Sequence, residues 1–300
     1  MATVRQGLSG SEPMSFLGVI GHPLKNSLSP VFQQAALDHL NLGITYEPWS
    51  TAADGLETRV TTLRAPTIVG ANVTIPHKEA IVPLLDKVDD LARTVGAVNT
   101  IVNDGGKLLG YNTDVEGAVE ALRRDAGFDP AGKRVVVAGA GGAARAMVVS
   151  LLRAKAASIV VINRTFSRAT KLVEELQPLA KGAALKALPE MHVSWTSATM
   201  GCDLVVNCTS AGSTGTGEEG DSPVPAEAIH AGALVYDIIY RPFETTLMRT
   251  AKERGARVLG GLPMLIYQGA ASFKLWTGRD APVEVMFEAA RTALKAEDGV

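Results

Sequence analysis

A glycine-rich loop near the middle of the chain has residue types and a spacing that could hold a phosphate group. The loop reads Gly139-Ala140-Gly141-Gly142-Ala143-Ala144; it follows the apolar run 134–138 and precedes apolar residues at helical spacing. Between a strand and a helix, Gly139 permits a tight turn, Gly141 lets backbone N–H groups approach a pyrophosphate, and Ala144 allows close helix packing. The helix N-terminus adds a partial positive charge. We therefore predict a dinucleotide site at residues 139–143, against the alternative of a glycine turn that binds nothing.

The residues that end the next apolar run, 158–163, discriminate between two nicotinamide cofactors. An NAD-binding unit usually places Asp or Glu there, where the carboxylate accepts hydrogen bonds from the ribose hydroxyls. This chain has Asn163, Arg164 and Thr165 instead, and Arg168 follows four residues after Arg164. Two guanidinium groups and a hydroxyl suit a 2′-phosphate dianion. We therefore expect NADP as the cofactor; the alternative is that both arginines lie on a solvated helix face.

The composition argues against several other classes of function. The 300 residues include 29 basic and 31 acidic side chains, and a net charge of −2 gives no electrostatic reason to bind nucleic acid. The longest uncharged apolar stretch, 258–273, is shorter than the roughly 20 residues that cross a bilayer. Cys202, Cys208 and five histidines form no metal-ligand pattern. Because the N-terminal residues also lack the apolar segment of a signal peptide, we expect a cytoplasmic protein without membrane, nucleic-acid or metal partners.

Strand-like and helix-like segments alternate along most of the chain, which predicts an α/β fold with mostly parallel sheets. The strand-like runs are residues 16–20, 44–49, 67–75, 98–103, 107–112, 134–138, 158–163, 204–207, 234–239 and 257–259. The helical patterns open at Ser29-Pro30 and at Thr113, and also cover 55–63, about 77–85, 144–152 and 281–294. Asp104-Gly105-Gly106 predicts a hairpin turn. We expect five or six parallel strands of the second half to form a Rossmann unit, and the last helix to return to the first domain.

Four further stretches are rich in polar residues near the ends of predicted strands. They are Gly21-His22-Pro23 with Ser27-Leu28-Ser29-Pro30, then residues 72–78, 96–100 and 111–114. Together with the glycine loop, Asn163-Arg164-Thr165 and the later stretch 261–268, their order and spacing resemble the shikimate dehydrogenase family. The resemblance runs from about residue 18 to residue 282.

The resemblance implies both a fold and an activity. The fold has an N-terminal α/β substrate domain, here residues 1–113 and 263–300 because the C-terminal helices return to it, and a Rossmann NADP-binding domain, residues 114–262. The activity is the reversible, NADP-dependent reduction of 3-dehydroshikimate to shikimate in aromatic amino-acid biosynthesis. The partner is thus a small-molecule substrate, and a homodimer is kept as a candidate assembly.

The resemblance also assigns roles to individual residues. Lys78 and Asp114 correspond to the catalytic pair of the family. The residues that match its substrate ligands are Ser27, Ser29, Thr74, Asn99, Tyr240 and Gln268. Ile238 and Gly261 match positions that line the nicotinamide.

The chemistry of these residue types agrees with those roles. A cyclic polyhydroxy acid needs many hydrogen-bond donors and acceptors, which Ser, Thr, Asn and Gln supply without net charge. Reduction of a ketone needs a hydride at carbon and a proton at the developing alkoxide, and the ammonium of Lys78 can donate that proton. Asp114, at a predicted helix start that favours its ionised form, would hold the lysine in place. Because the lysine must accept a proton in the oxidative direction, we expect oxidation to be faster at alkaline pH.

Two segments depart from the family pattern. Gln33-Gln34 stands where the family usually has His-Asn, and residues 207–213 lack the proline and the methionine of the family loop N-x-T-P-x-G-M. The first departure affects local helix contacts, and the second affects the stiffness and apolar cover of a loop near the cofactor.

Three other functions stay open at this point. The nearest is a quinate/shikimate dehydrogenase with a broader substrate range or NAD use, although Arg164 and Arg168 argue against NAD. A methylenetetrahydrofolate dehydrogenase-like enzyme would need an aromatic residue that stacks on a pterin, whereas a set of hydroxyl side chains suits a sugar-like acid. An NADP-binding redox sensor would keep the glycine loop but would not need Lys78 with Asp114.

Overall fold

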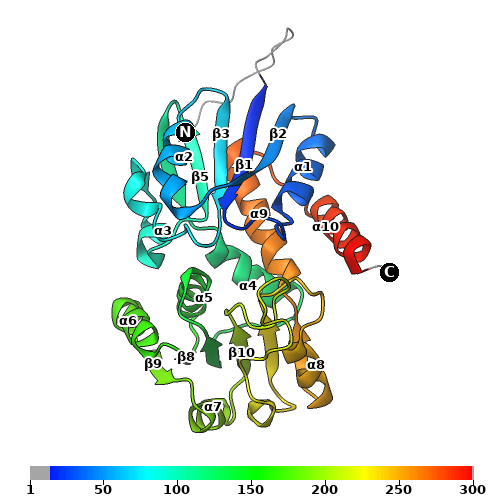
Figure 1. Cartoon of the computed structure of the whole chain (residues 1–300). Helices are drawn as coiled ribbons and strands as arrows, with labels where there is room; N and C mark the ends of the chain where they lie inside the picture. Colours follow the sequence, from blue (N-terminus) through cyan, green and yellow to red (C-terminus); the bar gives the residue numbers. More distant parts are fainter. Residues whose placement is uncertain (1–13, 299–300) are drawn as a thin grey trace. The chain divides into compact units, whose positions relative to one another are not determined.

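The computed structural model describes residues 14–298. The chain forms two compact units (Figure 1): unit 1 comprises the residues up to Thr113 and those from Gly269 onward, and unit 2 comprises residues 114–268. Each unit contains a six-stranded sheet. The predicted α/β fold with two domains is therefore confirmed. The expectation that the N-terminal segment is not a signal peptide concerns residues 1–13, which lie outside the described residues.

Unit 1 is built on a mixed sheet. Its strands are β1 (Ser15–Gly21), β2 (Ile44–Ser50), β3 (Ile68–Val73), β4 (Lys87–Val88), β5 (Thr100–Asp104) and β6 (Lys107–Tyr111), in the spatial order β2-β1-β3-β5-β6-β4. β1 is parallel to β2 and β3, β5 is antiparallel to β3 and β6, and β4 is parallel to β6. Ile20, Val73 and Ile101 lie in the apolar core of this unit.

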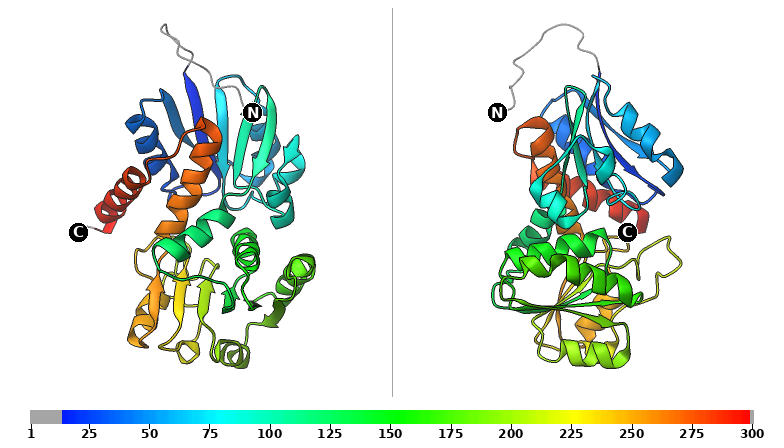
Figure 2. Two further views of the ribbon diagram at one scale, coloured as in Figure 1. Left: turned by 180° about the vertical axis from the view of Figure 1, so that it is seen from behind. Right: turned by 90° about the vertical axis from the view of Figure 1, so that its left-hand side faces the viewer.

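The C-terminal helix completes unit 1. The helices are α1 (Ser29–His39), α2 (Leu56–Thr62), α3 (Asp90–Val95) and α10 (Val283–Asp298), and α9 (Leu262–Thr277) begins in unit 2 and continues into unit 1. The red helix α10 packs against the blue helix α1 (Figures 1 and 2), with Met286, Ala290 and Leu294 buried. The predicted return of the last helix to the first domain is therefore confirmed.

The predicted hairpin joins β5 to β6. Asp104 pairs with Lys107, so the connection consists of Gly105 and Gly106 alone. Their φ angles are 61° and 91°, and a two-residue turn with positive φ at both positions favours glycine because other residues are strained there.

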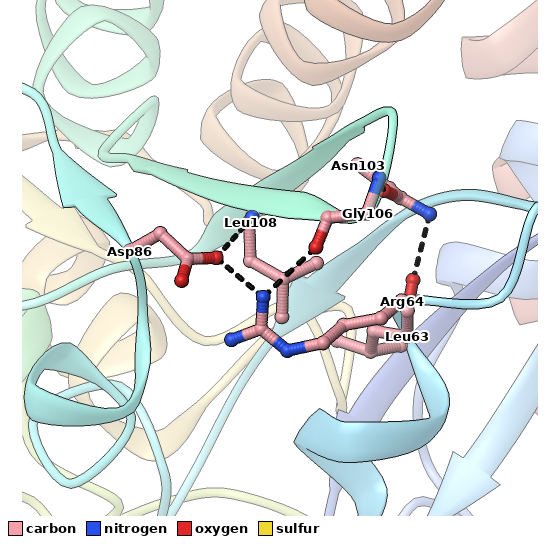
Figure 3. A network of polar contacts seen from close by, with 6 residues as sticks. All are labelled: Leu63, Arg64, Asp86, Asn103, Gly106 and Leu108. Carbon is pink, nitrogen blue, oxygen red and sulfur yellow. Dashed lines mark hydrogen bonds and ion pairs between the residues drawn. The ribbon is translucent and has the colours of Figure 1, made fainter.

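A polar network fixes this hairpin to its neighbours in unit 1 (Figure 3). The Arg64 guanidinium donates to the Asp86 carboxylate and to the carbonyl of Gly106, and the Asn103 amide donates to the carbonyl of Leu63. The hydrogen bond from Arg64, with a second one from the backbone N–H of Leu108, lowers the pKa of Asp86. The end of α2, the chain before β4 and the hairpin are thus connected through side chains.

The prediction of a helix over residues 77–85 is wrong. The segment forms turns and a short 3₁₀-helix, η2 (Val82–Leu84). Pro83 has no N–H to continue an α-helical ladder, and the N–H groups of Val82 and Leu84 bond three residues back, to Glu79 and Ile81. Lys78 therefore lies in a turn.

Unit 2 is a parallel sheet with helices on both faces, as the predicted Rossmann unit requires (Figure 2). Its strands are β7 (Arg134–Ala138), β8 (Ser158–Asn163), β9 (Ala184–Pro189), β10 (Leu204–Asn207), β11 (Leu234–Asp237) and β12 (Arg257–Leu259), in the order β12-β11-β10-β7-β8-β9. Its helices are α4 (Asp114–Arg124), α5 (Gly142–Arg153), α6 (Phe166–Leu176), α7 (His192–Thr199) and α8 (Thr246–Glu253).

Two details of unit 2 differ from the sequence-based assignment. The edge strand β9 was not among the predicted runs, because its short A-L-K-A-L-P sequence contains a lysine and buries only Leu185. β11 ends at Asp237 rather than at residue 239, so Ile238 and Ile239 lie beyond the strand. No helix among residues 14–298 is long and apolar enough to cross a membrane.

Candidate functional site

Asn99 lies at the centre of a buried polar cluster in unit 1. Its side-chain oxygen accepts hydrogen bonds from the backbone N–H of Thr113 at 2.8 Å and from the Thr100 hydroxyl at 3.0 Å. Its amide nitrogen donates to the Thr113 hydroxyl at 2.8 Å. These bonds fix the orientation of the amide, which is the property that a substrate ligand needs.

Sequence reasoning did not assign roles to the residues that support this cluster. The Asn72 amide donates to the Asn99 carbonyl and to the Ser272 hydroxyl, both at 3.1 Å, and the Tyr46 hydroxyl donates to the Asn72 side-chain oxygen at 2.7 Å. Burial raises the pKa of Tyr46, and a hydrogen bond with Ser29 opposes that shift. One feature of the sequence could have identified Asn72, because it is a polar residue within an apolar strand. It belongs to β3 and is 5% exposed.

The predicted substrate residues Ser27, Ser29 and Thr74 follow the carboxyl ends of two neighbouring parallel strands. The loop after β1 contains Ser27, whose hydroxyl accepts the backbone N–H of Ser29 at 3.3 Å. Thr74 follows β3, and a Cβ added to Gly21 would lie 2.4 Å from its methyl group. Because ligands of open α/β sheets bind at the carboxyl ends of strands, this edge of the unit 1 sheet suits a small ligand.

Two consecutive residues of unit 1, Val98 and Asn99, form hydrogen bonds with Lys78 and with Thr113, the residue before Asp114. The carbonyl of Lys78 accepts the N–H of Val98 at 2.8 Å. The next residue, Asn99, holds Thr113 through the bonds described above, and Asp114 follows Thr113 directly in the chain. Asp114 is the first residue of α4 and of unit 2.

The other two predicted substrate residues, Gln268 and Tyr240, belong to unit 2. Gln268 is in α9, where its amide donates to the Leu265 carbonyl at 2.6 Å. A Cβ added to Gly117 would lie 2.8 Å from the backbone nitrogen of Gln268, so α4 and α9 are in close contact there. Tyr240 lies in the segment after β11.

The glycine loop has the geometry that its sequence predicts. Gly139 directly follows β7 with a φ of 106°, and a Cβ there would lie 3.0 Å from the carbonyl oxygen of Cys208. Gly141 is the N-cap of α5, and a Cβ at this position would meet no atom within 4 Å. The loop therefore exposes the helix N-terminus with open space in front of it, which fits a pyrophosphate. Ala140 lies between these glycines, and Gly142 and Ala143 form the first turn of α5.

The four residues predicted to select NADP gather at the carboxyl end of β8, the strand next to β7. Asn163 ends the strand, and its amide donates to the carbonyl of Thr165 at 2.9 Å. The N–H of Arg168, in the first turn of α6, donates to the same carbonyl at 3.0 Å. The Arg164 side chain is 85% exposed and lies 3.5 Å from the Glu218 carboxylate. Sequence reasoning had not identified Glu218.

Ile238 and Gly261, the predicted nicotinamide-lining residues, are in direct contact. A Cβ at Gly261 would lie 2.0 Å from the carbonyl oxygen of Ile238, and the Gly261 N–H donates to the carbonyl of Ile239 at 3.0 Å. Only glycine permits this approach of the two backbones.

Asp237 directly precedes Ile238, and the sequence motifs assign it no role. Its buried carboxylate accepts hydrogen bonds from the Asn207 amide at 3.0 Å, the Thr245 hydroxyl at 2.7 Å and the Ile239 N–H at 3.1 Å. Burial raises the pKa of this carboxyl to about 6, although the three donors oppose the shift. Asp237 connects the end of β10, the start of α8 and the segment that contains Ile238.

Neither of the two cysteines has an activated thiol; Cys202 is buried and Cys208 is half-buried. Burial raises the pKa of the Cys202 thiol to about 11, and it also raises the pKa of the Cys208 thiol. Neither thiol is therefore poised to act as a nucleophile. Within the described part of the chain, 14–298, no group of three or more His, Cys, Asp or Glu residues could hold a metal ion.

Three sequence models of one family match successive parts of the chain. Residues 19–101 match the shikimate dehydrogenase substrate binding domain, residues 121–221 match shikimate / quinate 5-dehydrogenase, and residues 261–291 match the shikimate 5′-dehydrogenase C-terminal domain. Together they include the polar edge of unit 1, the glycine loop and Gly261.

Individual proteins are similar over almost their whole length. A protein of Moorella thermoacetica named shikimate dehydrogenase (NADP(+)) is 45% identical, over 94% of this chain and 95% of that protein. A crystal structure of Thermus thermophilus shikimate 5-dehydrogenase in complex with NADP(H) and shikimate is 40% identical, with a TM-score of 0.82 over 94% of this chain and 100% of that one.

A related enzyme of different specificity shares the fold. Quinate dehydrogenase of Corynebacterium glutamicum, in complex with NAD, is 28% identical with a TM-score of 0.84, over 93% of this chain and 99% of that one. The higher identities, and the matching order of the three family models, show that this chain belongs to the shikimate dehydrogenase family.

Proposed function

We propose that this protein is an NADP-dependent oxidoreductase that interconverts 3-dehydroshikimate and shikimate. The observation that carries the proposal is its 45% identity, over nearly the whole of both chains, to a protein named shikimate dehydrogenase (NADP(+)). The solved Thermus thermophilus enzyme, 40% identical, holds both shikimate and NADP(H). Aromatic amino-acid biosynthesis is the pathway that this reaction serves.

The proposed substrate ligands supply hydrogen bonds without adding charge. They are Ser27, Ser29, Thr74, Asn99, Tyr240 and Gln268, and they would bind the hydroxyls and the carboxylate of the substrate. Support comes from the Asn99 amide, whose orientation is fixed by Thr113 and Thr100. A side chain that is already ordered loses little entropy when it binds a ligand.

The proposed cofactor contacts lie in unit 2. The N–H groups of residues 139–143 would bind the pyrophosphate, because the loop exposes the N-terminus of α5. Asn163, Arg164, Thr165 and Arg168 would bind the adenosine ribose with its 2′-phosphate, and Ile238 and Gly261 would lie against the nicotinamide. When bound, NADPH supplies the hydride that reduces the carbonyl carbon.

The proposed proton transfer belongs to Lys78. In the reductive direction its ammonium donates a proton to the oxygen of the carbonyl as negative charge develops there. In the oxidative direction its neutral amine accepts the proton of the shikimate hydroxyl. The carboxylate of Asp114, the first residue of α4, would stabilise and orient the ammonium.

A four-way assay tests the proposal. The protein is mixed with shikimate or quinate and with NADP or NAD, and the absorbance of the reduced nicotinamide is followed. We expect the highest kcat/KM with shikimate and NADP. Preference for quinate with NAD would instead support the broader dehydrogenase reading, and no turnover with any pair, despite NADP binding, would support a sensor. We also propose that the protein is a homodimer, which the elution volume together with the intact mass tests. A cytoplasmic location is proposed as well, and cell fractionation tests it.

A further inference from the structure

Arg164, a proposed ligand of the 2′-phosphate, already has an anionic neighbour within unit 2. Its guanidinium Nη1 lies 3.5 Å from the Oε1 atom of Glu218. Glu218 belongs to the loop that follows β10, the same loop that lacks the family's proline and methionine. The carboxylate is thus within ion-pair distance of the guanidinium, which would also attract a phosphate oxygen.

The loop holds Glu218 in place. The Glu218 carbonyl accepts the N–H groups of Gly212 at 2.7 Å and Asp221 at 3.0 Å, and its own N–H donates to the Thr216 hydroxyl at 3.2 Å. The second carboxylate oxygen, Oε2, accepts the hydroxyl of Ser210 at 3.1 Å. Ser210 stands where the family pattern has a proline, which has no hydroxyl to donate.

The sheet order explains how the loop reaches Arg164. β10 and β8 are the two neighbours of β7, so a loop from β10 must cross the carboxyl end of β7 to reach the residues after β8. The start of this loop is already close to the glycine loop, because a Cβ at Gly139 would lie 3.0 Å from the carbonyl oxygen of Cys208. The start of the loop therefore lies beside Gly139, at the margin of the proposed pyrophosphate site.

We propose that Glu218 is a specificity-determining residue: its fixed carboxylate competes with the 2′-phosphate of NADP for Arg164. This inference rests on the proposed cofactor site. The ion pair must separate when a 2′-phosphate binds, whereas NAD, which has a hydroxyl at that position, leaves the pair intact. Glu218 therefore lowers the affinity for NADP relative to NAD. It reduces the preference for NADP over NAD that Arg164 and Arg168 create.

The test is Glu218→Gln, which removes the charge and keeps the size of the side chain. Binding is measured by calorimetry with adenosine 2′,5′-bisphosphate and with adenosine 5′-monophosphate, which differ only in the 2′-phosphate. We expect the variant to bind the bisphosphate about two- to fivefold more tightly, because an exposed ion pair is weak, and to bind the monophosphate as the wild type does. KM for NADP should fall by the same factor, with KM for NAD unchanged.

The neighbouring residue gives a matched control. Glu219 accepts the N–H groups of Gly215 and Gly217 through its side chain, so Glu219→Gln changes the same charge in the same loop away from Arg164. We expect that control to leave the ratio of the two affinities unchanged. Equal effects of the two substitutions, or an equal change for both adenosine ligands, would overturn the competition with Arg164.

Two further variants separate the inference from its alternatives. Ser210→Ala should shift the ratio in the same direction as Glu218→Gln, because it releases one carboxylate oxygen. In an Arg164→Ala background, Glu218→Gln should have no further effect; a persisting effect would contradict the proposal. The binding measurements need no turnover, so their result holds even if shikimate is not the substrate. If the protein turns over shikimate but Glu218→Gln leaves the ratio of the two adenosine affinities unchanged, the role of Glu218 is rejected and the proposed function is kept.

Discussion

The side-chain oxygen of Asn99 accepts the backbone N–H of Thr113 at 2.8 Å, and so fixes the residue that directly precedes Asp114. Asn99 directly follows Val98, and the N–H of Val98 donates to the carbonyl of Lys78. One short segment of unit 1 therefore binds the backbone of Lys78 and the backbone of Thr113, the residue before Asp114. Asn99 has two functions in this arrangement, since its amide is also a proposed ligand of the substrate.

We expect Asn99→Ala to weaken both substrate binding and the fold. The substitution leaves the Thr113 N–H without its acceptor, which costs about 1–3 kcal/mol of unfolding free energy, and KM for shikimate should rise about tenfold from the lost hydrogen bond. Urea denaturation and steady-state kinetics measure the two effects. Asn103→Ala is the control: its amide donates to the carbonyls of Leu63, Ala65 and Ile68, so it should lose stability with KM unchanged. An increase in KM for both variants would remove Asn99 from the substrate site.

Lys78→Met should abolish most of the activity and leave NADP binding intact. Loss of a general acid costs about 10²–10⁴-fold in rate, because no other group at this position is proposed to protonate the carbonyl oxygen. Stopped-flow turnover gives the rate, and titration with NADP gives the affinity. Lys87→Met, the same change in the edge strand β4, should keep the wild-type kcat. Wild-type rates of oxidation that stay constant from neutral to alkaline pH, with chemistry rate-limiting, would argue against lysine as the proton acceptor.

Local sequence signals predicted the elements with strong signatures. Two consecutive glycines predicted the turn between β5 and β6, because a two-residue turn favours residues that adopt positive φ angles, and both glycines have them. The G-x-G-x-x-A loop predicted the junction of β7 and α5. Elements without such signatures were missed or wrongly assigned. The 77–85 segment has a helical pattern of apolar residues, but Pro83 removes the N–H that an α-helix needs.

The supporting residues of the site depend on contacts between distant parts of the chain. Asn72 and Ser272 are 200 residues apart in sequence and form a hydrogen bond, and no spacing rule connects them. The pair of Arg164 and Glu218 likewise depends on the path of a loop whose sequence is low in complexity. The motifs lead to a proposal for the residues of the site, whereas the hydrogen-bond partners of those residues follow only from the folded chain.

Arg164→Asp should change the cofactor preference. The substitution removes a guanidinium that would bind the 2′-phosphate and places a carboxylate beside Glu218, so KM for NADP should rise about 10–100-fold, corresponding to the loss of one charge-assisted hydrogen bond. KM for NAD should change little, because no phosphate is present there. Arg153→Asp, the same charge change at the end of α5, is the control. Unchanged kinetics with both cofactors would place the 2′-phosphate elsewhere.

Asp237 should make stability depend on pH between about 4 and 6. Its pKa is about 6 in the folded protein against a usual value of 3.8, so between these values the folded state binds more protons than the unfolded state, and lowering the pH favours folding. Asp237→Asn lacks this titration. We therefore expect the unfolding free energy of the wild type, relative to the variant, to rise by about 1 kcal/mol from pH 7 to pH 5. Urea midpoints at several pH values measure it, and a constant difference would mean that the carboxyl titrates normally.

Gly261→Ala should disrupt the segment proposed to lie against the nicotinamide. The new Cβ would lie 2.0 Å from the carbonyl oxygen of Ile238, and because that atom belongs to the backbone, the two segments must separate. We expect a loss of about 3 kcal/mol of unfolding free energy, with a lower kcat in the fraction that folds. Gly260→Ala is a close control, since its Cβ would meet only the flexible end of Met248 at 3.4 Å. If both variants keep wild-type stability and kcat, then the close approach of Gly261 to Ile238 is not needed for activity, and the contact would be a consequence of the fold alone.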